Sequence, residues 1–384
     1  MVGSDMEKAL VVGCGLCGSV IARHLAEKGV NVEIWDRRNH IAGNMYDHKD
    51  KYGILIQEYG PHTFHTKNRS LYEYMCRFAD WKPFKLECGA VWNNKYTPTP
   101  FNFTTIDTFY PKDKAESLKA KLKAAYAGQS TATVVDVLQN PDDEIRGYAE
   151  YLFQNDYAPY TAKQWGVSPS EIDPSVLKRV PLRFSYDVGY FDDAYEAMPA
   201  ESFTAFFEKL LNHPNIQVKL GVEALEHLQV EQDVLKLDGA PVDFPVIYTG
   251  ALDELFNNEY GRLPYRSLRF EWFYEEKESL QDAPVVAYPQ EDGFTRITEY
   301  KKLPVQNLPG TSYAKEYPLP YEVENGAEPY YPVLTTDSMS QYEKYRAHAE
   351  KVKNLHLCGR LADFKYYNMD QALLHALEIC KSDF

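Results

Sequence analysis

The stretch Ala9-Leu-Val-Val-Gly-Cys-Gly-Leu-Cys-Gly18 decides the fold. Its apolar start predicts a buried strand, which runs directly into Gly13, Gly15 and Gly18 with the spacing GxGxxG. Such glycines allow a tight turn, and they let backbone N–H groups approach a pyrophosphate at the N-terminus of the following helix. The stretch therefore predicts a strand, a turn and a helix that together bind a dinucleotide.

The residues that follow complete a strand–helix–strand unit. The helix is expected over 18–28 and ends at Gly29, and a second strand follows over 31–36. Asp36 ends this strand 18 residues after Gly18. A carboxylate at about this distance binds the ribose hydroxyls of the dinucleotide. The unit predicts a parallel sheet with helical crossovers, and a bound FAD or NAD.

Two further segments favour FAD over NAD. The basic and polar stretch Arg37 to Asn44 resembles the second fingerprint of FAD proteins with the glutathione-reductase topology. The last strand, over 354–359, and the last helix, over 370–381, resemble the element with which such proteins place the flavin. NAD remains the alternative.

Composition excludes several classes of protein. The chain of 384 residues has a formal net charge of -15, which argues against a nucleic-acid binder and against binding to an anionic membrane. No run of 18 apolar residues appears, so no membrane span is expected and a cytoplasmic protein is predicted. Cys14 and Cys17 form a CxxC pair, but no second pair exists, and small residues packed under the glycine turn explain it better than a metal does.

The rest of the chain predicts an α/β fold with three parts. Helical periodicity occurs over 70–79, 112–127, 144–155 and 203–211, and strand patterns occur over 216–220, 230–237, 245–248 and 268–314. We expect a Rossmann-like FAD-binding domain from 1–78, 200–252 and 333–384. A helical domain over 79–180 is inserted, with a mobile lid near 166–183. An antiparallel β-sheet domain is expected from 181–199 and 253–332.

Six short segments resemble the UDP-galactopyranose mutase family, in the same order along nearly the whole chain. They are Gly60-Pro-His62-Thr-Phe-His65-Thr66, Tyr160-Thr-Ala-Lys-Gln-Trp165-Gly, Leu177-Lys-Arg179-Val-Pro-Leu-Arg183-Phe, Thr295-Arg296-Ile-Thr298-Glu299, Lys315-Glu316-Tyr317 and Gly359-Arg360-Leu. The resemblance implies an isomerase that interconverts the pyranose and furanose forms of a nucleotide-diphosphate sugar, with UDP-galactose as the first candidate. FAD in its reduced form is the implied cofactor, its N5 attacks the anomeric carbon, and NAD(P)H is the expected external reductant. The family also implies a homodimer and a role in cell-surface polysaccharide biosynthesis.

The resemblance assigns roles to individual residues. The expected catalytic residues are Arg179, Arg296 and His65. Cofactor binding is expected from Gly13, Gly15, Leu16, Gly18, Asp36, Arg37, Asn44, His62, His65, Arg360 and Met369. Substrate binding is expected from Tyr157, Tyr160, Thr161, Trp165, Arg179, Tyr190, Phe191, Arg266, Arg296, Tyr317, Tyr366 and Asn368.

The chemistry of the ligand agrees with these assignments. A diphosphate needs guanidinium groups, and Arg179, Arg266, Arg296 and Arg360 lie in aromatic or apolar settings rather than in charge runs. The stretch 166–183 contains three prolines, which suits a lid that brings Arg179 onto the phosphates. His62 and His65 have HxxH spacing, but no third ligand is evident and no metal is expected.

One position departs from the family pattern and leaves the base open. The family usually has two aromatic residues shortly before the segment 160–165, and this chain has Asp156 and Tyr157 there. A carboxylate gains little against uracil, whereas it can accept two hydrogen bonds from guanine, so a GDP-sugar is an alternative to a UDP-sugar. Two other functions share the expected fold: an oxidoreductase resembling amine oxidases, and a nucleotide-sugar binder without catalysis.

Overall fold

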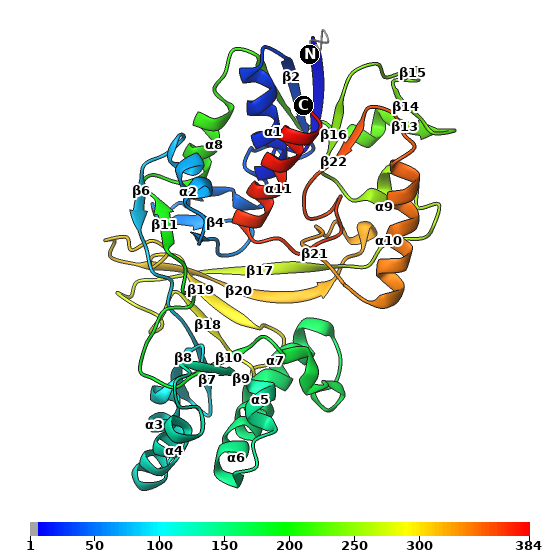
Figure 1. Cartoon of the computed structure of the whole chain (residues 1–384). Coiled ribbons are helices and arrows are strands. Elements are labelled where there is room, and N and C mark those ends of the chain that lie inside the picture. Colours follow the sequence, from blue (N-terminus) through cyan, green and yellow to red (C-terminus); the bar gives the residue numbers. More distant parts are fainter. Residues whose placement is uncertain (1–6) are drawn as a thin grey trace.

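A five-stranded parallel sheet forms one half of the molecule (Figure 1). The computed structural model describes residues 7–384. The strand order is β12-β2-β1-β16-β22. The strands are β1 (Lys8–Val12), β2 (Asn31–Asp36), β12 (Ile216–Leu220), β16 (Val246–Tyr248) and β22 (Leu355–Leu357). The first and last strands therefore belong to the same sheet, since β1 and β22 both pair with β16.

Three helices cover this sheet because each has one apolar side. They are α1 (Leu16–Glu27), α8 (Phe203–Leu211) and α11 (Met369–Ser382). Val20, Ile21 and Leu25 of α1 are almost fully buried, in one core with Phe206 of α8 and Leu373 of α11. Their i, i+4 spacing places them on one side of each helix, as the sequence pattern predicts.

A seven-stranded sheet lies next to this half and crosses the middle of the molecule (Figure 1). Its order is β21-β17-β20-β19-β18-β7-β8, and only β18 and β7 pair in parallel. The strands are β7 (Cys88–Trp92), β8 (Lys95–Thr99), β17 (Tyr265–Glu275), β18 (Val285–Ala287), β19 (Arg296–Glu299), β20 (Thr311–Pro320) and β21 (Tyr331–Pro332). Alternate residues on each strand face opposite sides of the sheet, so only side chains on the same side can contact one another.

A helical segment lies on the far side of the seven-stranded sheet (Figure 1). It contains α3 (Phe103–Phe109), α4 (Lys112–Ala125), α5 (Val134–Leu138), α6 (Asp143–Leu152), the π-helical turn η2 (Phe153–Tyr157) and α7 (Ala158–Trp165). Trp92, Phe101, Leu118 and Leu152 belong to its own buried core. Pro159 is the second residue of α7, just after the π-helical turn, and its missing N–H leaves the carbonyl of Asn155 without the usual helical partner.

Smaller elements join these parts. They are β3 (Asp47–Lys49), β4 (Leu55–Gln57), β5 (Phe64–Thr66), α2 (Arg69–Cys76), β6 (Trp81–Pro83), β9 (Thr131–Thr133), β10 (Pro181–Arg183), β11 (Tyr195–Pro199), β13 (Leu228–Glu231), β14 (Val234–Leu237), β15 (Ala240–Pro241), α9 (Leu252–Leu255) and α10 (Thr336–Ala349). Strand β11 lies between β5 and β6. Single helical turns form at η1 (Gly43–Met45), η3 (Pro169–Glu171), η4 (Pro174–Leu177), η5 (Ala224–Glu226) and η6 (Val323–Asn325).

The α/β fold with a Rossmann-like cofactor part is confirmed, and two local predictions are wrong. The predicted strand over 230–237 is a hairpin, because Gln232 and Asp233 adopt φ of 50° and 63° and reverse the chain. The predicted helix over 144–155 ends as an α-helix at Leu152 and continues as the π-helical turn. The division into three domains stays a prediction; the segment 79–180 supplies β7 and β8 to the large sheet. Among the helices of residues 7–384, none is both long and apolar enough to cross a bilayer.

Candidate cofactor and substrate site

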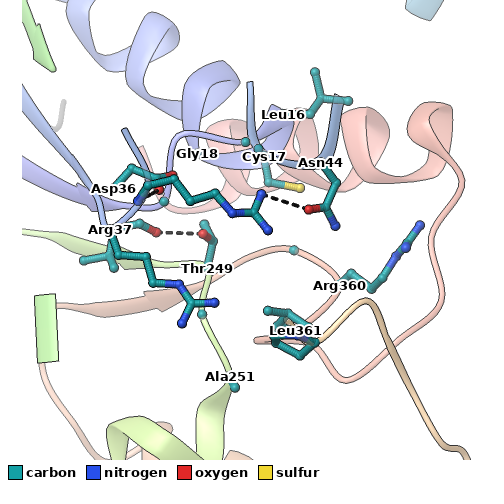
Figure 2. A pocket seen from close by; sticks show the side chains of 18 of the residues that line it. Leu16, Cys17, Gly18, Asp36, Arg37, Asn44, Thr249, Ala251, Arg360 and Leu361 are labelled. Atoms are coloured by element: carbon teal, nitrogen blue, oxygen red, sulfur yellow. Dashed lines mark hydrogen bonds between the residues drawn. The ribbon is translucent and has the colours of Figure 1, made fainter. Parts of the chain in front are cut away.

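A cavity of about 290 Å³ opens at the carboxyl ends of β1, β2 and β16 (Figure 2). Three parts of the chain line it: residues 12–62, residues 222–254 and residues 328–372. Ligands of parallel α/β sheets bind at this edge, where loops leave the strands and helices begin. Ten of the eleven residues expected to bind a cofactor line the cavity, and His65 does not: Gly13, Gly15, Leu16, Gly18, Asp36, Arg37, Asn44, His62, Arg360 and Met369.

The glycine turn leaves room for a ligand. Gly13 has φ of +104°, and a Cβ there would lie 2.0 Å from Oγ1 of Thr249, so only glycine fits. A Cβ on Gly15 would meet only Cα of Gly43, at 3.9 Å. Gly15 caps α1 without a side-chain hydrogen bond, so the first N–H groups of the helix remain available to an anion.

Asp36 is held at the rim of the cavity by two backbone groups. The N–H groups of Cys14 and Arg38 donate to its two carboxylate oxygens at 2.8 and 2.9 Å. Each oxygen keeps a lone pair for a ribose hydroxyl. This geometry fits the role that its spacing predicts.

Two arginines that follow β2 contact the loop before β21. Arg37 pairs with Glu328, and Arg38 lies 3.3 Å from the same carboxylate. Arg38 also donates to Asn44 at 2.9 Å, and its guanidinium lies 4.0 Å from the ring centre of Tyr59. Arg37 therefore lines the cavity while it is engaged with a carboxylate, so its role toward a cofactor stays a prediction.

The two histidines of the HxxH segment bond to different partners. His62 lines the cavity, and its Nδ1–H donates to the carbonyl of Gly60 at 2.8 Å. Burial lowers the pKa of His62 to about 4, so its imidazole is neutral at physiological pH and Nε2 is free to accept. His65 bonds through Nδ1 to Asp193 at 2.6 Å and stacks on Phe191, with ring centroids 3.5 Å apart.

Arg360 joins the loops on the opposite wall. It donates to the carbonyls of Tyr330 and Tyr367 at 3.0 and 2.6 Å, and it lies 4.8 Å from the ring centre of Tyr366. Burial lowers the pKa of its guanidinium, but the shift leaves it charged. Asn368, which lines the same wall, caps the N-terminus of α11.

Arg296 is the guanidinium that the fold fixes most firmly on the substrate side. It faces Glu316 across the pair β19–β20, and its Nε donates to that carboxylate at 2.8 Å. Burial alone would lower the pKa of Arg296, but Glu316 raises it above its usual range, so the charge is permanent. The side chain stays 30% exposed, so the two Nη groups can still form a fork to a phosphate.

This arginine lies close to the cofactor cavity. A Cβ on Gly60 would be 3.9 Å from the Glu316 oxygen that holds Arg296. The charge of Arg296 also acts on His62, which lines the cavity. The permanent cation and the cofactor cavity are therefore neighbours.

Two tyrosines interact electrostatically with the same cation. Arg296 acts on Tyr160 and Tyr190, and burial raises the pKa of both phenols, so they are hydrogen-bond donors at neutral pH. Tyr366, which is 60% exposed, interacts electrostatically with Tyr190. Tyr331 interacts electrostatically with both Arg266 and Arg296. The buried Nε of Arg266 has no hydrogen-bond partner within residues 7–384.

Five predicted substrate residues stand apart from this group. Tyr157 and Thr161 are buried, Tyr157 in the helical core against Phe101. Trp165 is 56% exposed, and Arg179 is exposed with no hydrogen bond or ion pair in the part of the chain that the structure describes. Tyr317 follows Glu316 on β20 and so faces the other side of the sheet, where its hydroxyl donates to Glu271 at 2.8 Å.

The structure also brings in residues to which the sequence assigned no role. They are Thr249 under the glycine turn, Asp193 against His65, Glu316 against Arg296, and Tyr330 and Tyr331 beside Arg360 and Arg266. Each acts on a residue that is distant in the sequence. Only the folded arrangement of strands and loops shows these contacts, so no local pattern could have found them.

One group of metal-type ligands occurs within residues 7–384. Ligand atoms of Cys358, Asp363 and His375 lie within 4.8 Å of one another. Asp363 already accepts from the N–H of Gly359 at 2.9 Å and pairs with His375 at 3.1 Å. These contacts connect the loop after β22 to α11, which explains why the three side chains lie together without a metal.

The fold and the cavity define a dinucleotide-binding protein of the Rossmann-like class, and residues 11–78 match the NAD(P)-binding Rossmann-like domain. Residues 155–366 match UDP-galactopyranose mutase. The chain belongs to the UDP-galactopyranose mutase family, whose members are flavin-dependent isomerases.

Relatives align along almost the whole chain. A dTDP-fucopyranose mutase of Escherichia coli is 35% identical over 97% of this chain and 97% of its own length. A UDP-galactopyranose mutase of Mycoplasma genitalium is 34% identical over 96% of this chain and 93% of its own. A crystal structure of reduced UDP-galactopyranose mutase superposes with a TM-score of 0.73 at 16% identity, over 98% of this chain and 93% of that one, which supports the fold.

Proposed function

We propose that the protein interconverts the pyranose and furanose forms of a nucleotide-diphosphate sugar, with UDP-galactose as the first candidate. The observation that carries this proposal is Arg296, held by Glu316 beside a cavity that fits a dinucleotide. Relatives of similar length that are named as sugar mutases support the same reaction.

The residues of the cavity fit FAD. The free N–H groups of α1 suit the pyrophosphate, and Asp36 suits the adenosine ribose. His62, Arg360 and Met369 line the part nearer the substrate side. When it is bound and reduced, FAD supplies a nucleophilic nitrogen, N5, for the anomeric carbon of the sugar.

The protein itself supplies position and charge. Breaking the bond at the anomeric carbon leaves negative charge on the nucleotide diphosphate, and the fixed guanidinium of Arg296 stabilises it. Tyr160, Tyr190 and Tyr366 add hydroxyl donors around it. Arg179 lies on the exposed segment 166–183, and we propose that this segment closes over the diphosphate and excludes water.

The direct experiment is turnover. Purified protein with its flavin reduced by dithionite is incubated with UDP-galactofuranose, and the products are separated by chromatography. We expect UDP-galactopyranose from the reduced protein and none from the oxidised protein. No conversion by reduced, flavin-loaded protein would overturn the assignment of UDP-galactose.

A dTDP-sugar is the second candidate substrate, because the Escherichia coli relative is named a dTDP-fucopyranose mutase. The same assay with dTDP-fucofuranose tests it, and a GDP-sugar tests the guanine alternative. Net oxidation of an amine or alcohol would instead indicate an oxidoreductase, and binding without turnover of any sugar would indicate a binder.

Three further parts of the proposal rest on the family resemblance, and a fourth, the location, rests on the sequence. We propose a homodimer, a cytoplasmic location, reduction by NAD(P)H and a role in cell-surface polysaccharide biosynthesis. Light scattering tests the dimer, and replacing dithionite by NADH or NADPH in the turnover assay tests the reductant.

A further inference from the structure

A second cavity, of about 310 Å³, lies beside the cofactor cavity. The two cavities share four lining residues, Arg37, Glu223, Leu225 and Glu254. The rest of the second cavity is lined by α9, the loop after it and the segment after β20: Asp253, Asn257, Asn258, Arg262, Leu263, Tyr321 and Val323. These seven residues do not line the cofactor cavity, so the second cavity is a compartment of its own.

Asp253 lines this compartment with an unpaired carboxylate oxygen. The residue is only 4% exposed. Its Oδ2 accepts from the N–H of Leu263 at 2.9 Å, whereas its Oδ1 is buried and has no hydrogen-bond partner within residues 7–384. Buried carboxylate oxygens are normally paired, because an unpaired one costs free energy. Oδ1 is therefore free to accept a hydrogen bond from a ligand.

Asn258 supplies a second unpaired acceptor to the same compartment. Its Oδ1 is also buried without a hydrogen-bond partner in the described chain. Asn257 and Asn258 adopt φ of 51° and 56°, and this turn lets the N–H of Asn258 donate to the carbonyl of Asp253 at 2.8 Å. The two unpaired oxygens thus belong to residues that are joined by a backbone hydrogen bond. A ligand with several N–H groups can satisfy both.

The arginines of the compartment are engaged with other carboxylates. Arg37 pairs with Glu328, and Arg262 lies 3.1 Å from Glu324. Neither guanidinium has an ion pair or hydrogen bond to Asp253 in the part of the chain that the structure describes. The buried carboxylate therefore lacks a cation of the protein itself.

The electrostatics of Asp253 agree with a missing cation. Burial raises the pKa of Asp253 to about 6, and the neighbouring charge of Glu254 raises it further. The groups that oppose this rise are backbone N–H groups, that of Leu263 first. The carboxyl is still ionised at about pH 7.5, where a bound cation would stabilise it.

The lining of the compartment favours an organic cation over a metal ion or an anion. Three carboxylates line it, those of Glu223, Asp253 and Glu254, and they oppose an anion. They do not form a metal-type group, since within residues 7–384 such a group of three occurs only at Cys358, Asp363 and His375. Apolar walls come from Leu225, Leu263, Tyr321 and Val323. An alkyl chain with an ammonium at each end matches separated carboxylates and apolar walls.

We propose that this compartment binds a linear aliphatic polyamine. One ammonium donates to Oδ1 of Asp253 and Oδ1 of Asn258, and another lies near Glu223 and Glu254, where the compartment adjoins the cofactor cavity. The inference goes beyond the proposed mutase reaction and does not depend on it. It assigns the protein a second small-molecule site, next to the cofactor.

The test is calorimetry of the flavin-loaded protein, in which the cofactor cavity is filled. The ligands are spermidine, putrescine, uncharged butanediol, and the chlorides of Mg²⁺ and Ca²⁺. Buffer of about pH 7.5 with about 0.15 M salt screens the general attraction of polyamines to a chain with a net charge of -15. We expect spermidine to bind at one site with Kd of about 10 to 100 µM, putrescine more weakly, and butanediol and both metal ions not measurably.

Two variants locate the site. Asp253→Asn keeps an oxygen for the N–H of Leu263 but removes the charge, so spermidine should bind at least about tenfold more weakly. Asn258→Gly removes the other acceptor at φ of 56°, which glycine adopts without strain, and should cost about fivefold. Asp113→Asn changes an exposed carboxyl on α4, in the helical segment, and should leave the affinity unchanged.

Melting temperatures without a ligand separate weak binding from a damaged fold. Asp253→Asn removes a buried charge that has no counter-ion, so it should melt no lower than the wild type at about pH 7.5. If it does melt lower, Asn258→Gly decides whether the site exists.

Three outcomes would overturn the inference. The first is equal affinity of the wild type and both cavity variants for spermidine, which indicates only general attraction to an acidic surface. The second is binding of Mg²⁺ or Ca²⁺ that is lost in Asp253→Asn, which makes this a metal site. The third is no binding of either polyamine, which leaves the compartment to water. Because no sugar is present, each result is independent of the mutase assay.

Discussion

The cofactor side and the substrate side of this site are built in different ways. The glycine turn, the start of α1 and Asp36 come from one continuous stretch, and backbone groups make the decisive contacts. On the substrate side, side chains from α7, β17, β19, β20 and the C-terminal loops converge, and Arg296 needs Glu316 from another strand to be held. A backbone site depends on conformation, whereas a side-chain site depends on charge and donor geometry, so the two sides should respond differently to substitution.

Gly13→Ala should have the largest effect, because it changes the backbone conformation on which the cofactor side depends. Its Cβ would lie 2.0 Å from Thr249 Oγ1 at φ of +104°, so the turn must move. We expect protein without bound flavin, measured as flavin absorbance per mole of purified chain.

Gly29→Ala is the matched control, because its φ is +91° but a Cβ there would meet nothing within 4 Å. It should keep its flavin and lose only about 1 kcal/mol of stability. Equal loss of flavin in both variants would show that strain in general, and not the close approach to Thr249, explains the result.

Arg296→Lys should spare the cofactor side and damage the substrate side. Lysine cannot hold Glu316 through one nitrogen while forming a fork to a phosphate. We expect kcat/KM to fall by about 100-fold with unchanged flavin content. Arg269→Lys is the control, because that guanidinium lies over Tyr317, on the other side of the same sheet, and should change kcat/KM less than about twofold.

Arg179→Ala sharpens the comparison at the proposed lid. The residue is exposed and forms no contact that stabilises the described chain, so the melting temperature should stay the same. We expect KM to rise by about tenfold, since one charge-assisted contact to a phosphate is lost. Lys178→Ala, its exposed neighbour, should leave KM unchanged; if both variants match the wild type, segment 166–183 does not close over the diphosphate.

His62→Asn should give the smallest effect, and only at low pH. The pKa of His62 is lowered to about 4 in the folded protein, below the value of about 6.5 in the unfolded chain. Between these two pH values the unfolded chain binds a proton that the folded protein does not bind. The stability contributed by the neutral imidazole is therefore present above pH about 6.5 and lost as the pH falls toward about 4.

Asparagine removes this linkage while its amide can still donate to Gly60. Urea unfolding at about pH 7 and about pH 4.5 should show the wild type losing on the order of 1 to 2 kcal/mol more than the variant. An equal loss in both proteins would place the acid sensitivity elsewhere.

The same contrast explains what the sequence could predict. The glycine spacing and Asp36 are local, because a turn and the two elements beside it lie within one short stretch, and the structure gathers these residues around one cavity. The resemblance located Arg296, but its bond to Glu316 depends on the register of β19 and β20, which no local pattern encodes. For the same reason Tyr317, one residue from Glu316, was expected beside the diphosphate and lies on the opposite side of the sheet.

The separation of the cavity walls along the sequence has a consequence for biosynthesis. The cavity draws its walls from the first strand and from the loop before the last helix, and α1 packs directly on α11. When the glycine turn has been synthesised, the walls from residues 222–254 and 328–372 have not yet been made. Firm capture of the flavin therefore requires α11 and the loop before it as well as the glycine turn.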